Sequence, residues 1–405
     1  MNNRLLPTGF FLINPMLFFS IGFIYYLLTP VFSLAVLVAD TPFDLADIPF
    51  DLLFQANKYI SLSFFDMYYF LDVFIILVTF YLGYRFSFFI NYKLTYSRFD
   101  LVAMSKNSAM TLAVVFVVMS LGLVMYSISL GVVFFSGYRH FNVTILGSLS
   151  TLAYISLFCS IFFYEPMYKY IFLSIFIGIA VLLLGLGSRN IVLNGFISLA
   201  VYKVWLSPQI LKSYKLYFVL LLLMLSMIAI GIWRSGYEFS LNMMISHFFA
   251  DALFVMTSAS SYLQNIGVRP VLEFPSSLFA GVVNFLPSLL FPQKIQIIAE
   301  MVNDHNMFSP FGASSIIVNL YSNFGMLYPI YIFFMAILYT YLYQRACIST
   351  FYRSIYIVIL PLLMFQFFNQ PLYSLVKLLF YNGIIIPFTI MVFFSFFINA
   401  HKRLR

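Results

Sequence analysis

Apolar residues in this chain fall into long blocks, which short charged or proline- and glycine-containing stretches separate. The blocks are about 18 to 28 residues long, the length that a helix needs to cross about 30 Å of hydrocarbon. Apolar and polar residues do not alternate with the period of two that a membrane β-barrel requires. The pattern therefore predicts an all-α polytopic membrane protein with about ten transmembrane helices, at roughly 10–38, 67–90, 109–136, 141–163, 170–187, 190–206, 216–233, 312–343, 352–369 and 376–399.

The composition agrees with this pattern and excludes a soluble domain. Hydrophobic residues make up 63% of the chain and charged residues only 8%, too few to cover a water-facing surface. The two cysteines, Cys159 and Cys347, are too few for a disulfide framework or a cysteine-based metal site. The first apolar run continues to residue 39 without a small-residue cleavage pattern, so we expect it to be a retained span.

The distribution of charge predicts how the spans are oriented. If Arg4 is cytoplasmic, most lysines and arginines fall in short inner loops, while most acidic residues fall at the other face. This bias predicts that both termini lie in the cytoplasm. The net charge of +8 is then mainly an orientation signal, with attraction to anionic membrane lipid as a secondary effect. It does not point to nucleic acid as a partner.

Two outer segments are longer than turns and divide the chain into three parts. Residues 40–65 have aspartates at helical intervals between apolar residues, which predicts a periplasmic helix lying in the membrane interface. The second segment, 234–311, is a large periplasmic loop between spans one to seven (1–233) and spans eight to ten (312–405). Within it, 239–262 is amphipathic and has His247 and Asp251 on one face. No internal repeat is evident in the sequence.

Three arginines at the predicted outer face are candidates for binding phosphate. Arg189 lies in the tight turn 185–190 between two spans, Arg234 follows Trp233 at the end of the seventh span, and Arg269 precedes Pro270. A guanidinium is a planar, permanently charged fork of donors that matches the oxygens of a diphosphate. Each arginine also has an ordinary interpretation, as a membrane-interface anchor for the first two and as a loop salt-bridge partner for Arg269.

The densest polar cluster is 303–306, followed by Ser309, just before the eighth span. His305 can exchange a proton near neutral pH, and the neighbouring Asp304 could orient its imidazole, which suits activation of a sugar hydroxyl. The same composition is also common in turns and helix caps. His247 is a second candidate. Walker A, Gly-x-Gly-x-x-Gly, His-Glu-x-x-His and an outer Asp-x-Asp pair are all missing, so we expect neither a metal nor a cofactor.

These residues resemble a known family. Gly-Ser-Arg at 187–189, Arg234 at the start of a large outer loop, and His305-Asn306 before the stretches 311–314 and 319–326 resemble the bacterial O-antigen polymerases, which share a superfamily with the O-antigen ligases. The resemblance covers the topology of the whole chain, and its motifs lie between residues 185 and 327. One departure is Ala200, which stands where an Arg-x10-Gly pattern of some members has glycine.

The resemblance implies a C-type glycosyltransferase fold and a metal-independent membrane glycosyltransferase. Such an enzyme would move a growing glycan from undecaprenyl diphosphate onto a new undecaprenyl-diphosphate-linked repeat unit at the periplasmic face. It also implies a chain-length regulator and a flippase as partner proteins. We expect the diphosphate at Arg189, Arg234 and Arg269, catalysis at His305 with Asp304, and further substrate contacts as follows: Asn306, Ser309 and Asn323.

Two other functions fit parts of this sequence. An O-antigen ligase would use the same arginines and histidine but would transfer the glycan to the lipid A core. A lipid-linked oligosaccharide flippase would move its substrate without covalent chemistry. The large outer loop and the scarcity of charges in the middle of the spans favour an enzyme over a transporter.

Overall fold

A computed structural model describes residues 13–31, 67–90, 97–135, 143–235, 238–265, 271–286, 291–306 and 314–403. In these ranges the regular structure is entirely helical, and no strand occurs. Seven helical segments are long and apolar enough to cross a membrane, which confirms a polytopic helical membrane protein: Tyr69–Phe89, Lys106–Ser129, Ile145–Phe162, Pro166–Gly185, Tyr214–Trp233, Ile316–Ala346 and Leu372–Phe396.

The other three predicted spans are also helical, but they are shorter or more polar. They correspond to Pro15–Val31, to α9 (Arg189–Leu206) and to α16 (Thr350–Met364). At 1.5 Å per residue, the 15 residues of α16 cover only about 22 Å of a hydrocarbon layer that is about 30 Å thick. The count of ten spans therefore stays a prediction, and the predicted interfacial helix at 40–65 lies outside the described residues.

The described helices up to Ser235 are, in chain order, α1 (Pro15–Phe23), η2 (Ile24–Leu28), α4 (Met67–Phe89), α5 (Asp100–Ala103), α6 (Lys106–Ser129), α7 (Val143–Phe162), α8 (Pro166–Gly185), α9, η6 (Pro208–Lys212) and α10 (Tyr214–Ser235). After it come α11 (Leu241–Asn265), α12 (Ser276–Val283), α13 (Lys294–Asn306), α14 (Ile316–Phe324), η8 (Gly325–Leu327), α15 (Tyr328–Ala346), α16, α17 (Gln366–Asn369), α18 (Leu372–Val376), η9 (Lys377–Ile385) and α19 (Ile386–Arg403).

The predicted span at 312–343 is two helices in the structure. α14 ends at Gly325, whose φ of 56° lies in the left-handed region that glycine tolerates best, and α15 begins three residues later. The span predicted at 376–399 also differs from a simple helix, because η9 is a π-helix that begins at Lys377. Irregular helical turns of this kind are often found at functional sites.

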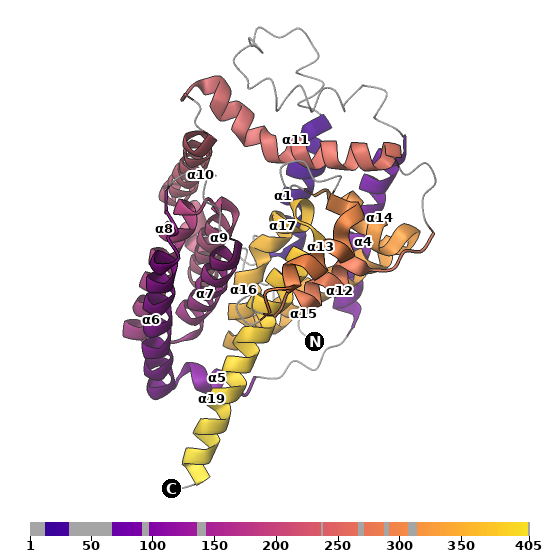
Figure 1. Ribbon diagram of the computed structural model, residues 1–405. Helices are drawn as coiled ribbons and strands as arrows, with labels where there is room; N and C mark the ends of the chain where they lie inside the picture. The colour runs from indigo at the N-terminus through magenta and orange to yellow at the C-terminus, as the bar shows by residue number, and fades with distance from the viewer. Residues whose placement is uncertain are drawn as a thin grey trace.

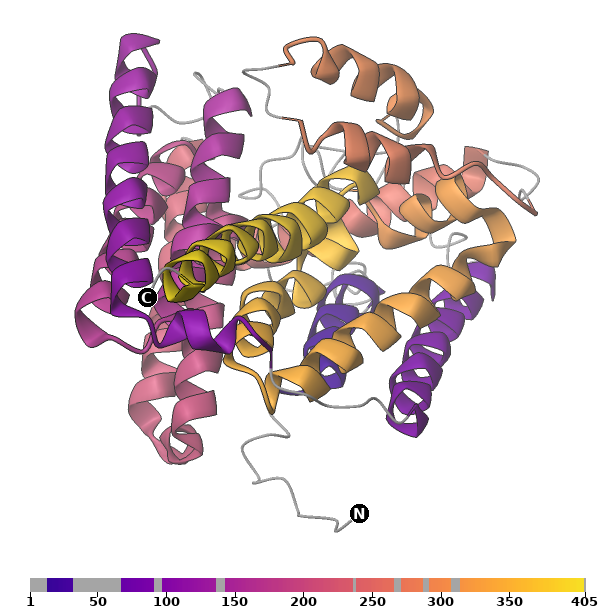
Figure 2. The same cartoon turned by 90° about the horizontal axis from the view of Figure 1, so that it is seen from below.

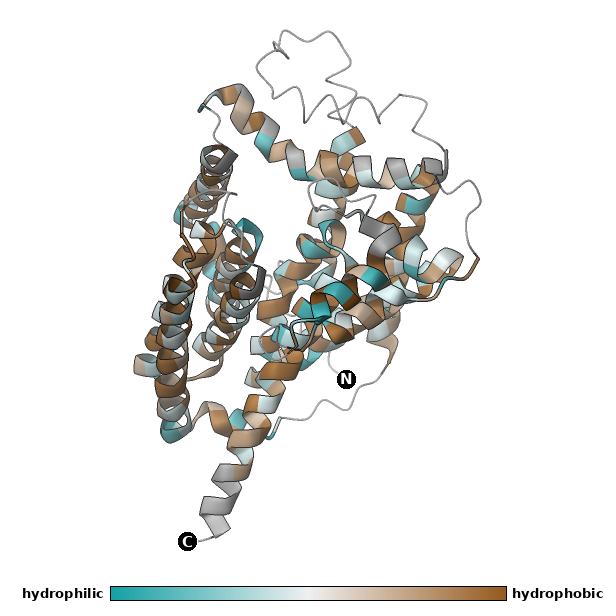
Figure 3. Ribbon diagram, viewed as in Figure 1, coloured by the Kyte–Doolittle hydropathy of each residue, from teal (hydrophilic) through white to brown (hydrophobic). Residues whose placement is uncertain are grey.

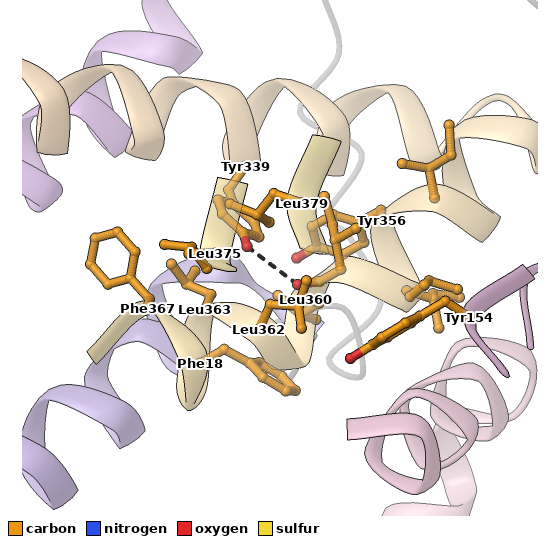
Figure 4. Packing of buried hydrophobic residues seen from close by; sticks show 14 of the residues in the cluster. Phe18, Tyr154, Tyr339, Tyr356, Leu360, Leu362, Leu363, Phe367, Leu375 and Leu379 are labelled. Atoms are coloured by element: carbon orange, nitrogen blue, oxygen red, sulfur yellow. Dashed lines mark hydrogen bonds between the residues drawn. The ribbon is translucent and has the colours of Figure 1, made fainter. Parts of the chain in front are cut away.

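The helix α16 lies at the centre of the protein and contacts α1, α7, α9 and α15. Almost all of its side chains from Ser354 to Leu363 are buried, so it is apolar all round, as a helix enclosed by other helices must be. Figure 4 shows Tyr339 and Tyr356 packed with leucines of this core, and the Tyr339 hydroxyl donates to the Ile359 carbonyl at 3.3 Å. Outer helices such as α6 and α10 instead expose large apolar side chains, as lipid contact requires.

The two ends of the helix bundle differ. α11 runs across the end at which α10 finishes, whereas α5 and the last turns of α19 lie at the opposite end (Figure 1). Seen from below, α6 and α4 lie on opposite sides of α19 (Figure 2). Backbone hydrogen bonds join Phe135 to Gly185 beyond α6 and Tyr164 to Ala103 beyond α7, so α6, α7 and α8 alternate in direction. This alternation agrees with the predicted order of crossings. Hydropathy colouring shows apolar bundle helices and more hydrophilic turns in α11 and α13 (Figure 3).

Candidate functional site

The turn between α8 and α9 places Arg189 at the end of the bundle that α11 covers. Gly187 has a φ of 91°, and the amides of Gly187 and Ser188 donate to the carbonyls of Leu184 and Leu183 at 2.9 and 2.8 Å. These bonds satisfy the free carbonyls at the end of α8 and reverse the chain within three residues. Arg189 is therefore the first residue of α9 and is held by a helix on each side.

The Arg189 side chain reaches across to α10. Its Nη1 donates to the Met227 carbonyl at 3.4 Å, and a Cβ placed on Gly231 would lie only 2.0 Å from that nitrogen. The guanidinium thus occupies space that any side chain at position 231 would take. Arg234 lies three residues farther along α10, where neighbouring helical positions are about 5 to 6 Å apart between Cβ atoms. The helices that carry the two predicted arginines therefore meet, although the Arg234 side chain is outside the description.

Two residues of α11 join Arg189. The ring of His247 lies 3.3 Å from where a Cβ of Gly231 would be, and its Nδ1–H donates to the Met243 carbonyl at 3.2 Å. Burial raises the pKa of the Asp251 carboxyl, while the charges of Arg189 and His247 act in the opposite direction. Burial likewise lowers the pKa of His247. Arg189, His247 and Asp251 thus form a polar cluster, in which the sequence predicts a phosphate-binding role for Arg189 and makes His247 a second catalytic candidate, but assigns Asp251 no role.

A cavity of about 1120 Å³ adjoins this cluster. It is bounded by α6, α7, the α8–α9 turn, α11 at Asp251, residues 284–286 after α12, α13 and the region from α17 to η9. Its cationic side chains are Arg189, Lys294 and Lys377, and Asp251 is its carboxylate within the part of the chain that the structure describes. Further hydroxyl and amide groups face it from Ser188, Asn190, Gln366, Gln370 and Tyr373. Met119 and Leu123 give it an apolar wall on α6. The cavity therefore has a cationic part and an apolar part.

The two lysines come from segments that are far apart in the sequence. Lys294 is buried at the start of α13, where its Nζ donates to the Leu286 carbonyl at 2.6 Å. Burial and the charge of Lys377 lower the pKa of Lys294 to about 8. The Nζ of Lys377 lies against α7, because a Cβ on Gly147 would be 3.4 Å from it. Neither lysine was singled out from the sequence, where both look like ordinary interfacial charges.

The predicted catalytic cluster is at the end of α13. Asp304, His305 and Asn306 belong to its last turn, but their side chains are outside the description. Ile298 and Val302 of the same helix line the cavity, and position 305 is one turn beyond Val302 on that side of the helix. Arg269 and Ser309 lie outside the described residues.

Asn323 is part of the packing between α12 and α14. It is fully buried, its Oδ1 accepts from the Ser277 amide at 2.8 Å, and its Nδ2 donates to the Asn319 carbonyl at 2.7 Å. These bonds fix the start of α12 on α14. Asn323 does not line the cavity, so it is not placed to contact a substrate there.

A metal-ligand cluster was not expected from the sequence. Within the described ranges, no group of three or more His, Cys, Asp or Glu side chains is arranged to hold a metal ion. The charged groups that could act on an anion there are the basic side chains of the cavity. Comparison of the chain with protein-family models, curated proteins and solved structures gave no match.

Proposed function

We propose that this protein is a membrane glycosyltransferase of the O-antigen polymerase type. It transfers a growing glycan from undecaprenyl diphosphate onto a new undecaprenyl-diphosphate-linked repeat unit at the periplasmic face of the bacterial inner membrane. The observation that carries the proposal is the cavity beside α11, in which Arg189, Lys294 and Lys377 converge from three separate elements next to an apolar wall on α6. A prenyl diphosphate has the same two parts, a charged headgroup and an apolar tail.

The cations have a clear role in such a transfer. A hydroxyl oxygen of the acceptor sugar forms a bond to the anomeric carbon of the donor, the bond from that carbon to the diphosphate oxygen breaks, and its electron pair leaves with the diphosphate. Fixed positive charges in a cavity of low dielectric stabilise this developing negative charge. Arg189 is the best placed of them, because it starts α9 and its guanidinium is positioned against Met227 and Gly231 of α10. Arg234 is proposed to contact the same diphosphate from α10.

The proton of the acceptor hydroxyl needs a base. His305, oriented by Asp304, is the proposed base, since α13 lines the cavity up to Val302. Asp251 is the alternative, because it faces the same cavity and burial favours its protonation. A His305→Ala protein should lose about 10²- to 10⁴-fold in transfer rate. If the His305→Ala protein transferred glycan at the wild-type rate and the Asp251→Asn protein lost transfer, Asp251 would be the base.

An O-antigen ligase would share the Arg189 site. The decisive experiment is therefore elongation by the purified protein in liposomes, supplied with lipid-linked repeat units extracted from cells in which its gene is deleted. We expect a ladder of products that is lost in Arg189→Gln and kept in Lys212→Gln, whose exposed lysine lies in η6, outside the cavity. Unchanged elongation in Arg189→Gln, or a wild-type protein that forms no ladder, would refute the proposal.

A further inference from the structure

The lysines of the cavity form a second cationic group, separate from the cluster around Arg189. Arg189 donates to the Met227 carbonyl of α10, whereas Lys294 donates to the Leu286 carbonyl and the Nζ of Lys377 lies against Gly147 of α7. Lys294 comes from α13 and Lys377 from η9, so the fold brings two like charges together in a buried place. Such an arrangement is unfavourable unless an anion neutralises it.

The lysine pair has few partners of its own. Lys294 donates to backbone carbonyls of Leu286 and Asn284, which carry no full charge. For Lys377, no hydrogen-bond partner is found among the described residues, and its ammonium group lies in the cavity against Gly147. Hydrogen-bonding capacity of an ammonium is therefore left for a ligand.

Gln366 provides an independent observation beside the lysines. Its side chain is 1% exposed and lines the same cavity, yet its Oε1 has no hydrogen-bond partner among the described residues. A buried amide oxygen without a donor is costly, so an acceptor of this kind points to a missing donor such as a hydroxyl. The two lysines can bind an anion, and the amide oxygen of Gln366 can accept a hydrogen bond from a hydroxyl. A sugar linked to a phosphate group carries both of these groups.

We propose that Lys294 and Lys377 bind a second diphosphate, that of the acceptor lipid-linked repeat unit, in the same cavity as the donor diphosphate at Arg189. The inference rests on the proposed function and deepens it. The cavity of about 1120 Å³ is larger than the roughly 300 to 1,000 Å³ of a pocket for one small ligand, so it has room for two headgroups. Two diphosphate sites are what a polymerase needs, because both of its substrates carry one.

The experiment counts bound prenyl diphosphates. Purified protein in nanodiscs of zwitterionic phosphatidylcholine is titrated with farnesyl diphosphate, and the bound molecules are counted by native mass spectrometry. We expect two per wild-type chain and one in both Lys294→Gln/Lys377→Gln and Arg189→Gln. The matched control Lys212→Gln/Lys215→Gln removes two exposed lysines and should still bind two. Lys294→Arg/Lys377→Arg keeps the charges, and its two bound molecules would show that the glutamine variant lost a site and did not simply unfold.

The alternative results are distinct. One farnesyl diphosphate per wild-type chain, unaffected by the lysine changes, would overturn the second site and leave the proposed function standing. Displacement from the lysine site by an equal mole fraction of phosphatidylglycerol would identify an anionic lipid headgroup site and also overturn the inference. No binding of farnesyl diphosphate to any form of the protein would count against the proposed function as well.

Discussion

The buried polar groups around α14 and those around the cavity differ in how fully they are hydrogen-bonded. Around α14, Asn323 bonds to Ser277 and Asn319, and Asn319 in turn donates to the Gln370 carbonyl at 2.8 Å and accepts from the Ser314 hydroxyl at 3.2 Å. In the cavity, the ammonium of Lys377 and the amide oxygen of Gln366 have no such partners among the described residues.

The difference separates structural polar groups from candidate binding groups. A buried amide whose donors and acceptors are all used stabilises the packing of helices and has nothing left for a ligand. Groups that are buried around a cavity and incompletely bonded are destabilising by themselves, so they indicate that something else binds there. On this criterion Asn323 belongs to the fold, and Arg189 with the two lysines belongs to the site.

Among the changes that test this contrast between bonded and unbonded groups, Arg189→Gln should have the largest effect on transfer. Loss of a fixed charge that stabilises a leaving group should lower the turnover of purified protein by about 10²- to 10³-fold. The variant should keep the wild-type thermal stability in detergent, because the one hydrogen bond of this side chain to a described residue is the long one to the Met227 carbonyl, at 3.4 Å. If thermal stability fell strongly along with turnover, Arg189 would instead be a residue that stabilises the fold.

Asn323→Ala should show the opposite behaviour. It leaves the buried amide of Ser277 without an acceptor, which costs about 1 to 3 kcal/mol of unfolding free energy. Denaturant titration in mixed micelles would measure the loss, and farnesyl diphosphate binding per folded protein should stay at the wild-type level. Weakened binding in a protein of unchanged stability would show that the criterion misassigns Asn323.

Gly231→Ala tests the position of Arg189 without removing it. The added methyl group would lie 2.0 Å from Nη1, so the flexible arginine must move, while alanine itself favours the helix. We expect about tenfold slower transfer at unchanged stability, since misplacement of a charge by an ångström is costly. Gly178→Ala is the matched control on α8, because nothing lies within 4 Å of its added Cβ. Equal rates in both variants would show that Arg189 does not act from this position.

The smallest effect concerns pH. The pKa of Lys294 is about 8, below its ordinary value of 10.5, so its ammonium loses a proton as the pH rises through 8. Because the neutral amine no longer attracts the diphosphate, farnesyl diphosphate binding at the second site should weaken a few-fold between pH 7 and 9. Over the range from 8 to 10.5 the unliganded fold should gain stability, because only the unfolded chain still binds that proton. Lys294→Arg should remove the pH dependence, and its persistence would exclude Lys294 as the titrating group.

The sequence by itself determined where the chain forms helices. Long apolar blocks can satisfy their backbone in lipid only as helices, so helices occur at all ten predicted places, and the tight turn at Gly187 placed Arg189 at a helix start. Amphipathic spacing likewise predicted α11 with His247 and Asp251 on one face. These features depend on residues that are near one another in the chain.

Only the tertiary structure decided which polar groups meet and which are already bonded. Lys294 is 72 positions from Gln366 and 83 from Lys377, and nothing in local periodicity indicates that α13 surrounds one cavity together with α17 and η9. The same holds for Asn323, whose amide is used by Ser277, 46 positions away. Burial and hydrogen bonding are set by helices packing across the fold, and a pattern along the chain carries no information about those contacts.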